Sequence, residues 1–115
     1  MQLKLYYDKV WFFQEPIDFR KSLDGLIYAI EQSQRKPSEG LYLFCNKSKT
    51  RLKGICWHKN GFLMLYKRLE KGHFSLSERS KKTIELTVEE FEWLLAGLNW
   101  SAMRHWGDLS YSKFS

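Results

Sequence analysis

The sequence has little of what most catalytic and metal sites are built from. Its 115 residues include only two cysteines, Cys45 and Cys56, which are too few for a disulfide framework and lack the paired spacing of a structural zinc site. It contains no glycine-rich phosphate loop and no H-E-x-x-H, C-x-x-C or G-x-S-x-G motif. We therefore expect reduced cysteines in the core, no bound metal, no cofactor and no enzyme activity.

Long hydrophobic runs are also missing. No run approaches the roughly 20 apolar residues that a membrane-spanning helix needs, and Asp8 and Lys9 interrupt the apolar N-terminal stretch, which has no small-residue cleavage site. Proline and glycine are scarce, at two and seven residues, while 43% of the chain is hydrophobic. These features predict a single cytoplasmic domain over residues 1–115, with no membrane partner and a tail that frays from about residue 101.

Positive charge is concentrated in the middle of the chain. The net charge is +6 overall, but residues 1–34 carry −1, residues 35–82 carry +10 and residues 83–115 carry −3. Scattered lysines usually mark a solvated surface, whereas a concentrated basic region is what phosphate binding requires. The charge pattern therefore favours an anionic partner such as DNA.

Hydrophobic patterning predicts both strands and helices. Strand-like runs of β-branched and aromatic residues cover residues 10–14, 41–45, 52–58, 62–69 and 83–87. One predicted helix is opened by an N-capping Asp18 and reaches Ile30. A second begins at Thr87 with a T-V-E-E capping box and ends near Gly97. The expected fold class is α+β, with an antiparallel meander sheet and two principal helices.

The central hairpin sorts its residues into two faces. With Asn60-Gly61 as a two-residue turn, Trp57 pairs with Met64, Ile55 with Tyr66, and Cys56 with Leu65. One resulting face is almost wholly aliphatic and is expected to be core. The other mixes rings with basic side chains: Tyr42, Phe44, Lys53, Ile55, Trp57, Met64, Tyr66 and Arg68. This mixed face either stacks on bases and contacts phosphates, or is covered by a helix.

The start of the first predicted helix also has two interpretations. Arg20 and Lys21 fall in its first turn, where cations and free helix amides together can receive a phosphate. Equally, Arg20 can pair with Asp24 one turn later.

Potential metal ligands have simpler explanations. A zinc site could be imagined from four residues, but its two cysteines are irregularly spaced: Cys45, Cys56, His58 and His73. Asp18 and Asp24 are separated by six positions, which does not place them cleanly on one helix face. A capping Asp18 and a solvated Asp24 explain them better than a magnesium pair.

Three stretches carry a resemblance to a known family: PIDFRKSLDGL (16–26), RLKGICWHKNGF (51–62) running on to YKRLEKGHF (66–74), and LTVEEFEWLLAGLNW (86–100). Their order and spacing resemble the second-reading-frame accessory proteins, of the TnpB type, of the insertion sequence 66 family of bacterial transposable elements. The resemblance implies a small protein encoded beside a DDE-type transposase and needed for transposition, with no established catalytic activity of its own. His58 departs from the family pattern, in which an acidic residue commonly follows the tryptophan, and the family's usual Trp-Pro is absent near Ser75.

The leading hypothesis is therefore a non-catalytic accessory protein that binds element DNA. Its expected contacts are Arg20, Lys21, Arg51, Lys53, Trp57, Tyr66, Lys67 and Arg68. A second hypothesis is an adaptor whose aromatic face docks the DDE transposase. A weaker third is a metal-dependent nuclease that would use Asp18 and Asp24.

Overall fold

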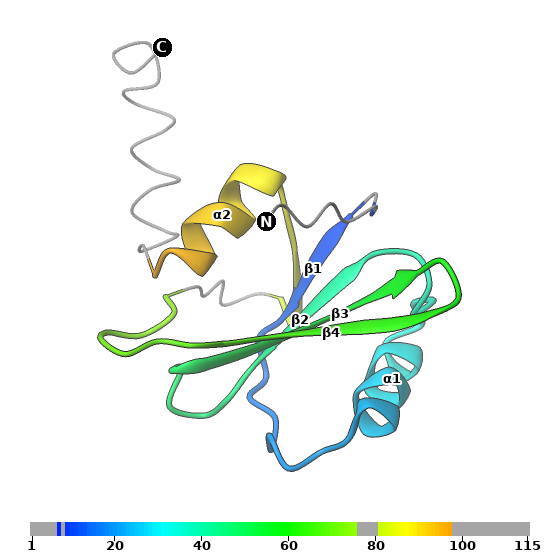
Figure 1. The fold of residues 1–115 in the computed structure, drawn as a ribbon, viewed down its shortest axis with the longest axis horizontal. Coiled ribbons are helices and arrows are strands. Elements are labelled where there is room, and N and C mark those ends of the chain that lie inside the picture. Colours follow the sequence, from blue (N-terminus) through cyan, green and yellow to red (C-terminus); the bar gives the residue numbers. More distant parts are fainter. Residues whose placement is uncertain (1–6, 8, 76–80, 98–115) are drawn as a thin grey trace, which may run out of the picture.

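The part of the chain that the structure describes forms a five-stranded sheet with one helix on each face (Figure 1). The structure is a computed structural model that describes residues 7, 9–75 and 81–97. The strands are β1 (Val10–Phe13), β2 (Leu41–Cys45), β3 (Arg51–His58), β4 (Gly61–Arg68) and β5 (Thr83–Leu86), and the helices are α1 (Leu23–Gln32) and α2 (Val88–Leu95). The predicted α+β class is confirmed, whereas the tail from residue 101 lies outside the described residues. Neither helix is long and apolar enough to cross a membrane.

The sheet is mixed and contains the predicted antiparallel meander. Its strand order is β4-β3-β2-β1-β5. The meander β2-β3-β4 is antiparallel as predicted, but β1 runs parallel to β2, and β5 lies antiparallel on the other side of β1. The parallel pair is possible because α1 lies between β1 and β2 in the chain and provides the crossover connection that parallel neighbours need.

Each face of the sheet has its own core. The aliphatic face predicted from the sequence packs against α2, and its buried residues are Val10, Phe12, Leu41, Leu43, Cys45, Leu52, Cys56, Phe74, Ile84, Leu86, Phe91 and Leu94. The mixed face packs against α1, with Leu26, Ile30, Tyr42, Phe44 and Ile55 buried. Because the sheet is covered on both sides, its central strand β2 is buried along its whole length.

The β3–β4 hairpin is shifted by two residues from the predicted register. Trp57 pairs with Phe62 and His58 with Gly61, so the tight turn consists of Lys59 and Asn60. Lys59 takes the positive φ, 53°, that the prediction had left to glycine, and Gly61 begins β4. Because side chains alternate with a period of two, a shift of two changes the partners but keeps every side chain on its predicted face.

Helix α1 begins later than the sequence predicts. Its N-cap is Ser22, and Asp18 lies outside the helix. Asp18 instead closes a local turn, because its Oδ1 accepts from the Arg20 amide at 2.9 Å and its carbonyl accepts from the Lys21 amide at 3.0 Å. A short aspartate side chain that bonds a nearby amide competes with helix formation in this way.

Helix α2 begins as predicted. Thr87 Oγ1 accepts from the Glu90 amide, and the Glu90 carboxylate accepts from the Thr87 amide, each at 3.0 Å. The C-cap is Ala96, and Gly97 follows it with a φ of +75°, the left-handed conformation in which glycine is favoured.

Removing the capping hydroxyl is expected to destabilise the protein measurably. Thr87→Ala leaves the Glu90 amide without its acceptor, and we expect the free energy of unfolding to fall by about 1 kcal/mol in urea titrations. Thr87→Ser keeps the hydroxyl and is expected to retain most of the stability. If the alanine and serine variants lose the same amount, the cap is not what stabilises this end of α2.

Candidate nucleic-acid interface

Four chain segments that are distant in sequence meet at one end of the sheet. The Ile17 amide donates to Cys45 O at 3.1 Å, which places the segment after β1 beside the end of β2. The Leu69 amide donates to Thr50 O at 2.8 Å, so the chain leaving β4 lies beside the β2–β3 turn. The start of β5 joins them, because the Gln14 amide donates to Lys82 O at 2.9 Å. Side chains from all four segments therefore share one end of the molecule.

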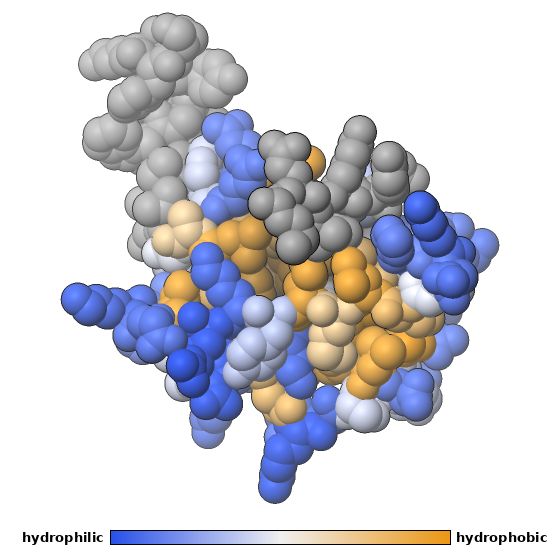
Figure 2. All heavy atoms as spheres, viewed as in Figure 1, coloured by the Kyte–Doolittle hydropathy of each residue, from blue (hydrophilic) through white to orange (hydrophobic). Residues whose placement is uncertain are grey.

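Most of the charge at this end is positive. We call it the cationic end and define it by Arg20, Lys21, Lys47, Lys49, Arg51, Arg68, Lys71 and Lys82, all of them exposed. Arg51 and Arg68 face each other directly across the β3–β4 ladder. Figure 2 shows hydrophilic residues gathered where the β2–β3 turn and the end of β4 lie in Figure 1. Six cations of the basic middle of the sequence are thus gathered at this end: Lys47, Lys49, Arg51, Arg68, Lys71 and Lys82.

Two of these cations are already paired with carboxylates. Arg20 Nη2 lies 2.6 Å from Asp18 Oδ2, and Arg68 Nη2 lies 2.9 Å from Glu70 Oε1. The hydrogen bonds from Arg20 hold the pKa of Asp18 at about 2, so this exposed pair stays ionised at neutral pH. Among the described residues, the remaining six cations have no carboxylate partner: Lys21, Lys47, Lys49, Arg51, Lys71 and Lys82.

Arg20 and Lys21, the predicted DNA contacts at the start of the first helix, lie outside that helix. Arg20 and Lys21 precede α1, which begins at Leu23, so they do not share its first turn. Arg20 pairs with Asp18 and not with Asp24. The expected phosphate site on the helix amides is therefore wrong, although both cations are still exposed at the cationic end.

Lys53 and Lys67 are engaged within the chain. Lys53 is 8% exposed, and its ammonium donates to Phe19 O at 2.9 Å and lies 4.8 Å from the centroid of the Phe19 ring. Phe19 in turn contacts the Tyr66 ring, at 6.3 Å between centroids. Lys53 thus holds the segment that carries Arg20 and Lys21 against β4. Lys67 points to the other face of the sheet, where its ammonium donates to Leu95 O at the end of α2.

The mixed face is half covered and half open, so each sequence interpretation describes part of it. Helix α1 covers Tyr42, Phe44 and Ile55. Trp57, at 40% exposed, and Tyr66, at 53%, lie beyond the helix on the β3–β4 hairpin, together with the exposed Met64. Tyr66 is two residues before Arg68 in β4, so the two side chains are neighbours on the same face of the sheet. This places the Tyr66 ring next to the cationic end.

The lysines of the turns were not among the contacts expected from the sequence. Lys47 and Lys49 sit in the β2–β3 turn, where Asn46 accepts from the Thr50 and Arg51 amides at 2.9 and 3.0 Å and fixes the turn. Lys71 follows β4. The only sequence signal for Lys47 and Lys49 was the charge of the middle block, because no motif contains them, whereas Lys71 lies within YKRLEKGHF (66–74).

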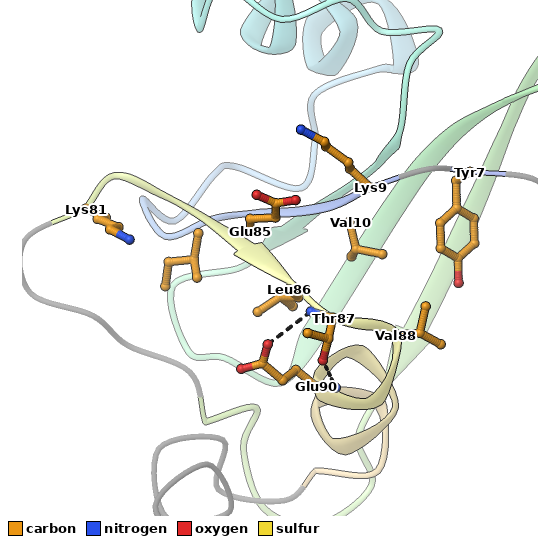
Figure 3. Close-up of a pocket in the computed structure, with 10 residues that line it drawn as sticks. Tyr7, Lys9, Val10, Lys81, Glu85, Leu86, Thr87, Val88 and Glu90 are labelled. Carbon is orange, nitrogen blue, oxygen red and sulfur yellow. Dashed lines mark hydrogen bonds between the residues drawn. The ribbon is translucent and has the colours of Figure 1, made fainter. Parts of the chain in front are cut away.

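A cleft on the α2 side is lined by two carboxylates, of which Glu90 is committed to the capping box. It has a volume of about 450 Å³ and is lined by Tyr7, Lys9, Val10, Lys81, Ile84, Glu85, Leu86, Thr87, Val88 and Glu90 (Figure 3). Figure 3 shows Glu90 turned back toward Thr87, with both hydrogen bonds of the capping box drawn. The described residues include no group of three or more histidines, cysteines or carboxylates arranged to hold a metal ion.

The two cysteines are buried thiols on the α2 face. Cys45 is 3% exposed and Cys56 is 1% exposed, and neither forms a disulfide. Burial raises the pKa of Cys45 from 9.0 to about 11 and raises that of Cys56 in the same direction. Because the thiolate is the reactive form, these side chains are suited to packing and not to nucleophilic chemistry.

The raised pKa of Cys45 predicts a loss of stability in alkali. The folded state favours the protonated thiol, so this contribution is complete below about pH 9 and is lost as pH rises toward 11. The free energy of unfolding should therefore fall more steeply between pH 9 and 11 in the native chain than in Cys45→Ala. Lysine and tyrosine titration affects both proteins equally, so parallel curves would contradict the prediction.

Comparison with known proteins gives one family. The family model described as IS66 Orf2 like protein matches residues 8–105. The chain is also 30% identical over 92 residues to the uncharacterized protein y4jC of Sinorhizobium fredii (strain NBRC 101917 / NGR234), an alignment that covers 78% of this chain and 79% of the relative. No solved structure gives a significant match.

Proposed function

Because the chain belongs to the IS66 Orf2-like family, a family of insertion-sequence transposition accessory proteins, we propose that it binds the DNA of its element through the cationic end. The observation that supports this most directly is the gathering of six exposed cations without carboxylate partners from four chain segments. A sheet end with this charge attracts phosphates and holds them at several points. The proposed role is non-catalytic.

The proposed mechanism is neutralisation of the DNA backbone. Each phosphate that a lysine or arginine neutralises releases condensed counterions, which supplies affinity without reading sequence. Tyr66, exposed beside the cationic end, adds a ring on which an unpaired base can stack. The protein would thereby hold element DNA in a fixed orientation for the transposase.

The number of free cations limits the expected salt dependence. If all six contact phosphates, the slope of log affinity against log salt for duplex DNA is about −5, since each contact contributes about −0.9. We propose fluorescence anisotropy with duplex and single-stranded oligonucleotides from the element ends over a salt series. If the protein does not bind DNA at low salt, or if its affinity for DNA does not change with salt, the proposal is wrong.

An adaptor for the DDE transposase is the second candidate, and the open half of the mixed face favours it. Trp57, Met64 and Tyr66 form an exposed apolar strip on β3 and β4. Such residues are enriched in the centres of protein interfaces. Co-purification of the transposase from nuclease-treated extract, lost in Trp57→Ser and retained in Arg51→Gln, would support the adaptor; loss of association after nuclease treatment would show that DNA bridges the two.

A further inference from the structure

A second cleft lies at the opposite end of the sheet from the cationic end. It has a volume of about 460 Å³ and is lined by Lys9, Trp11, Gln34, Arg35, Lys36, Glu39 and Tyr42. These residues come from the start of β1, the start of β2 and the loop that follows α1. The cleft is large enough for a nucleotide-sized ligand.

The walls of this cleft are fixed by contacts within the chain. Tyr42 OH donates to Lys36 O at 2.7 Å, which ties the loop after α1 to β2. Gly40 lies under Trp11, and a Cβ there would come within 3.1 Å of Lys9 O and 3.4 Å of Trp11 Cδ1. Only glycine allows this close approach at a φ of +154°. The cleft is therefore a built feature of the fold and not a gap between loose side chains.

Three cations and one carboxylate line the cleft. The Arg35 guanidinium lies 4.3 Å from the centroid of a Trp11 ring, and Lys9 Nζ lies 5.7 Å from it. Figure 3 shows Lys9 leaving its strand on the side opposite to Val10. The carboxylate, Glu39, is exposed and lies 3.7 Å from Lys36, so the charge of Arg35 and Lys9 is not balanced by it.

Arg35 also has an unmet hydrogen-bond donor. Its Nη1 donates to Ser33 O at 3.1 Å, but its Nε is buried and donates to no atom of the described residues. A buried donor without an acceptor is costly, and native structures usually satisfy it with protein, water or ligand. As the side chain lies, this Nε is closed to solvent, so an anion in the cleft would bond the other N–H groups of the guanidinium.

We propose that this cleft binds the phosphate of a nucleotide, with Arg35 and Lys9 as the phosphate ligands and Trp11 as the apolar wall. The proposal rests on the proposed function, since it makes the cleft a second contact for DNA, distinct from the cationic end. A free nucleotide has the same phosphate chemistry as a DNA terminus. The experiment must therefore separate the two sources.

Pyrophosphate titrated into the ¹⁵N-labelled full chain tests the cleft itself. We expect the Trp11 indole and the Arg35, Lys36 and Gly40 amides to shift, and Arg35→Gln to weaken this binding roughly tenfold, the loss typical of one charged hydrogen-bond partner. Lys9→Gln is the second variant, in case Arg35→Gln disturbs folding, which urea titration would reveal. Lys47→Gln, in the cationic end, is the matched control and should leave the shifts unchanged. Shifts confined to the cationic end would overturn the proposal. So would a pyrophosphate affinity in Arg35→Gln and Lys9→Gln that equals that of the native chain.

Oligonucleotides with and without a 5′-phosphate, and deoxyadenosine monophosphate, then identify the source. Tighter binding of the phosphorylated strand, lost in Arg35→Gln, supports a DNA terminus, and binding of the mononucleotide alone supports a free nucleotide. If DNA binding depends on salt but is unchanged in Arg35→Gln and Lys9→Gln, nucleotide binding in the cleft is contradicted and the proposed function stands. If the cleft binds pyrophosphate but the protein has no affinity for DNA, the cleft proposal stands and the proposed function is wrong.

Discussion

Replacing Arg51 and Arg68 together with glutamine is expected to weaken DNA binding on the order of 100-fold at low salt, because it removes the phosphate contact of Arg51 and the cation that neutralises Glu70. The two arginines face each other across the β3–β4 ladder at the cationic end. Their loss removes two adjacent cations and also leaves Glu70, the partner of Arg68, to repel phosphates. Anisotropy titrations over a salt series measure both the affinity and the slope.

The same hairpin supplies the control for this variant. Lys59 lies in the turn at its far end, so Lys59→Gln removes one charge from the same hairpin without touching the cationic end. We expect its salt slope to match that of the native chain. If Lys59→Gln weakens binding as much per charge as the double variant does, affinity follows net charge, and the cationic end is not a site.

Replacing Phe44 with alanine is expected to lower the free energy of unfolding by about 3–5 kcal/mol, the usual cost of deleting a buried ring. Phe44 is 0% exposed on the central strand β2 and stacks on Phe13, with 4.8 Å between ring centroids. It belongs to the core under α1, with Leu26 and Ile30. Removing the ring therefore opens a cavity between the helix and the sheet. Urea titration monitored by circular dichroism measures the loss.

Tyr28 gives the matched control for the core variant. Tyr28 lies on α1, the helix that packs over Phe44, but is itself 62% exposed. Tyr28→Ala is therefore expected to change the free energy of unfolding by about 0.5 kcal/mol or less. Phe44→Leu keeps most of the apolar volume and should fall between the two. A Phe44→Ala loss as small as that of Tyr28→Ala would mean that α1 does not depend on this core.

The local pattern of the sequence predicted the hairpin and its faces but not its exact pairing. Alternation placed Trp57, Met64 and Tyr66 on one side because the side-chain period of a strand is two whatever the register. The register itself depended on whether Lys59 or Gly61 occupied the turn, and Lys59 adopts a positive φ that lysine rarely takes. The motif at Thr87 was predicted fully, because a capping box is complete within four residues.

Features that depend on distant residues were not predictable in this way. The place of β1 beside β2 is set by long-range packing, and no local pattern names the partner of an isolated strand. Lys53 has the composition of a surface cation, but its ammonium is bonded to Phe19, 34 positions away. The turn lysines joined the site only because the ends of β2, β4 and the segment before α1 meet. Which residues lie at the candidate site thus depends on the topology of the sheet, whereas the motifs can be recognised from the sequence alone.

The pairing of β1 with β5 sets an order for assembly during synthesis. Phe13 pairs with Thr83, so β1 has emerged from the ribosome long before the strand that closes its outer side. Until then a nascent chain that has already joined β1 to β2 presents an open strand edge and uncovered Val10 and Phe12, the kind of surface on which chains aggregate. A message truncated before Thr83 would yield a product that keeps this edge, and such a product is expected to need chaperones or to precipitate.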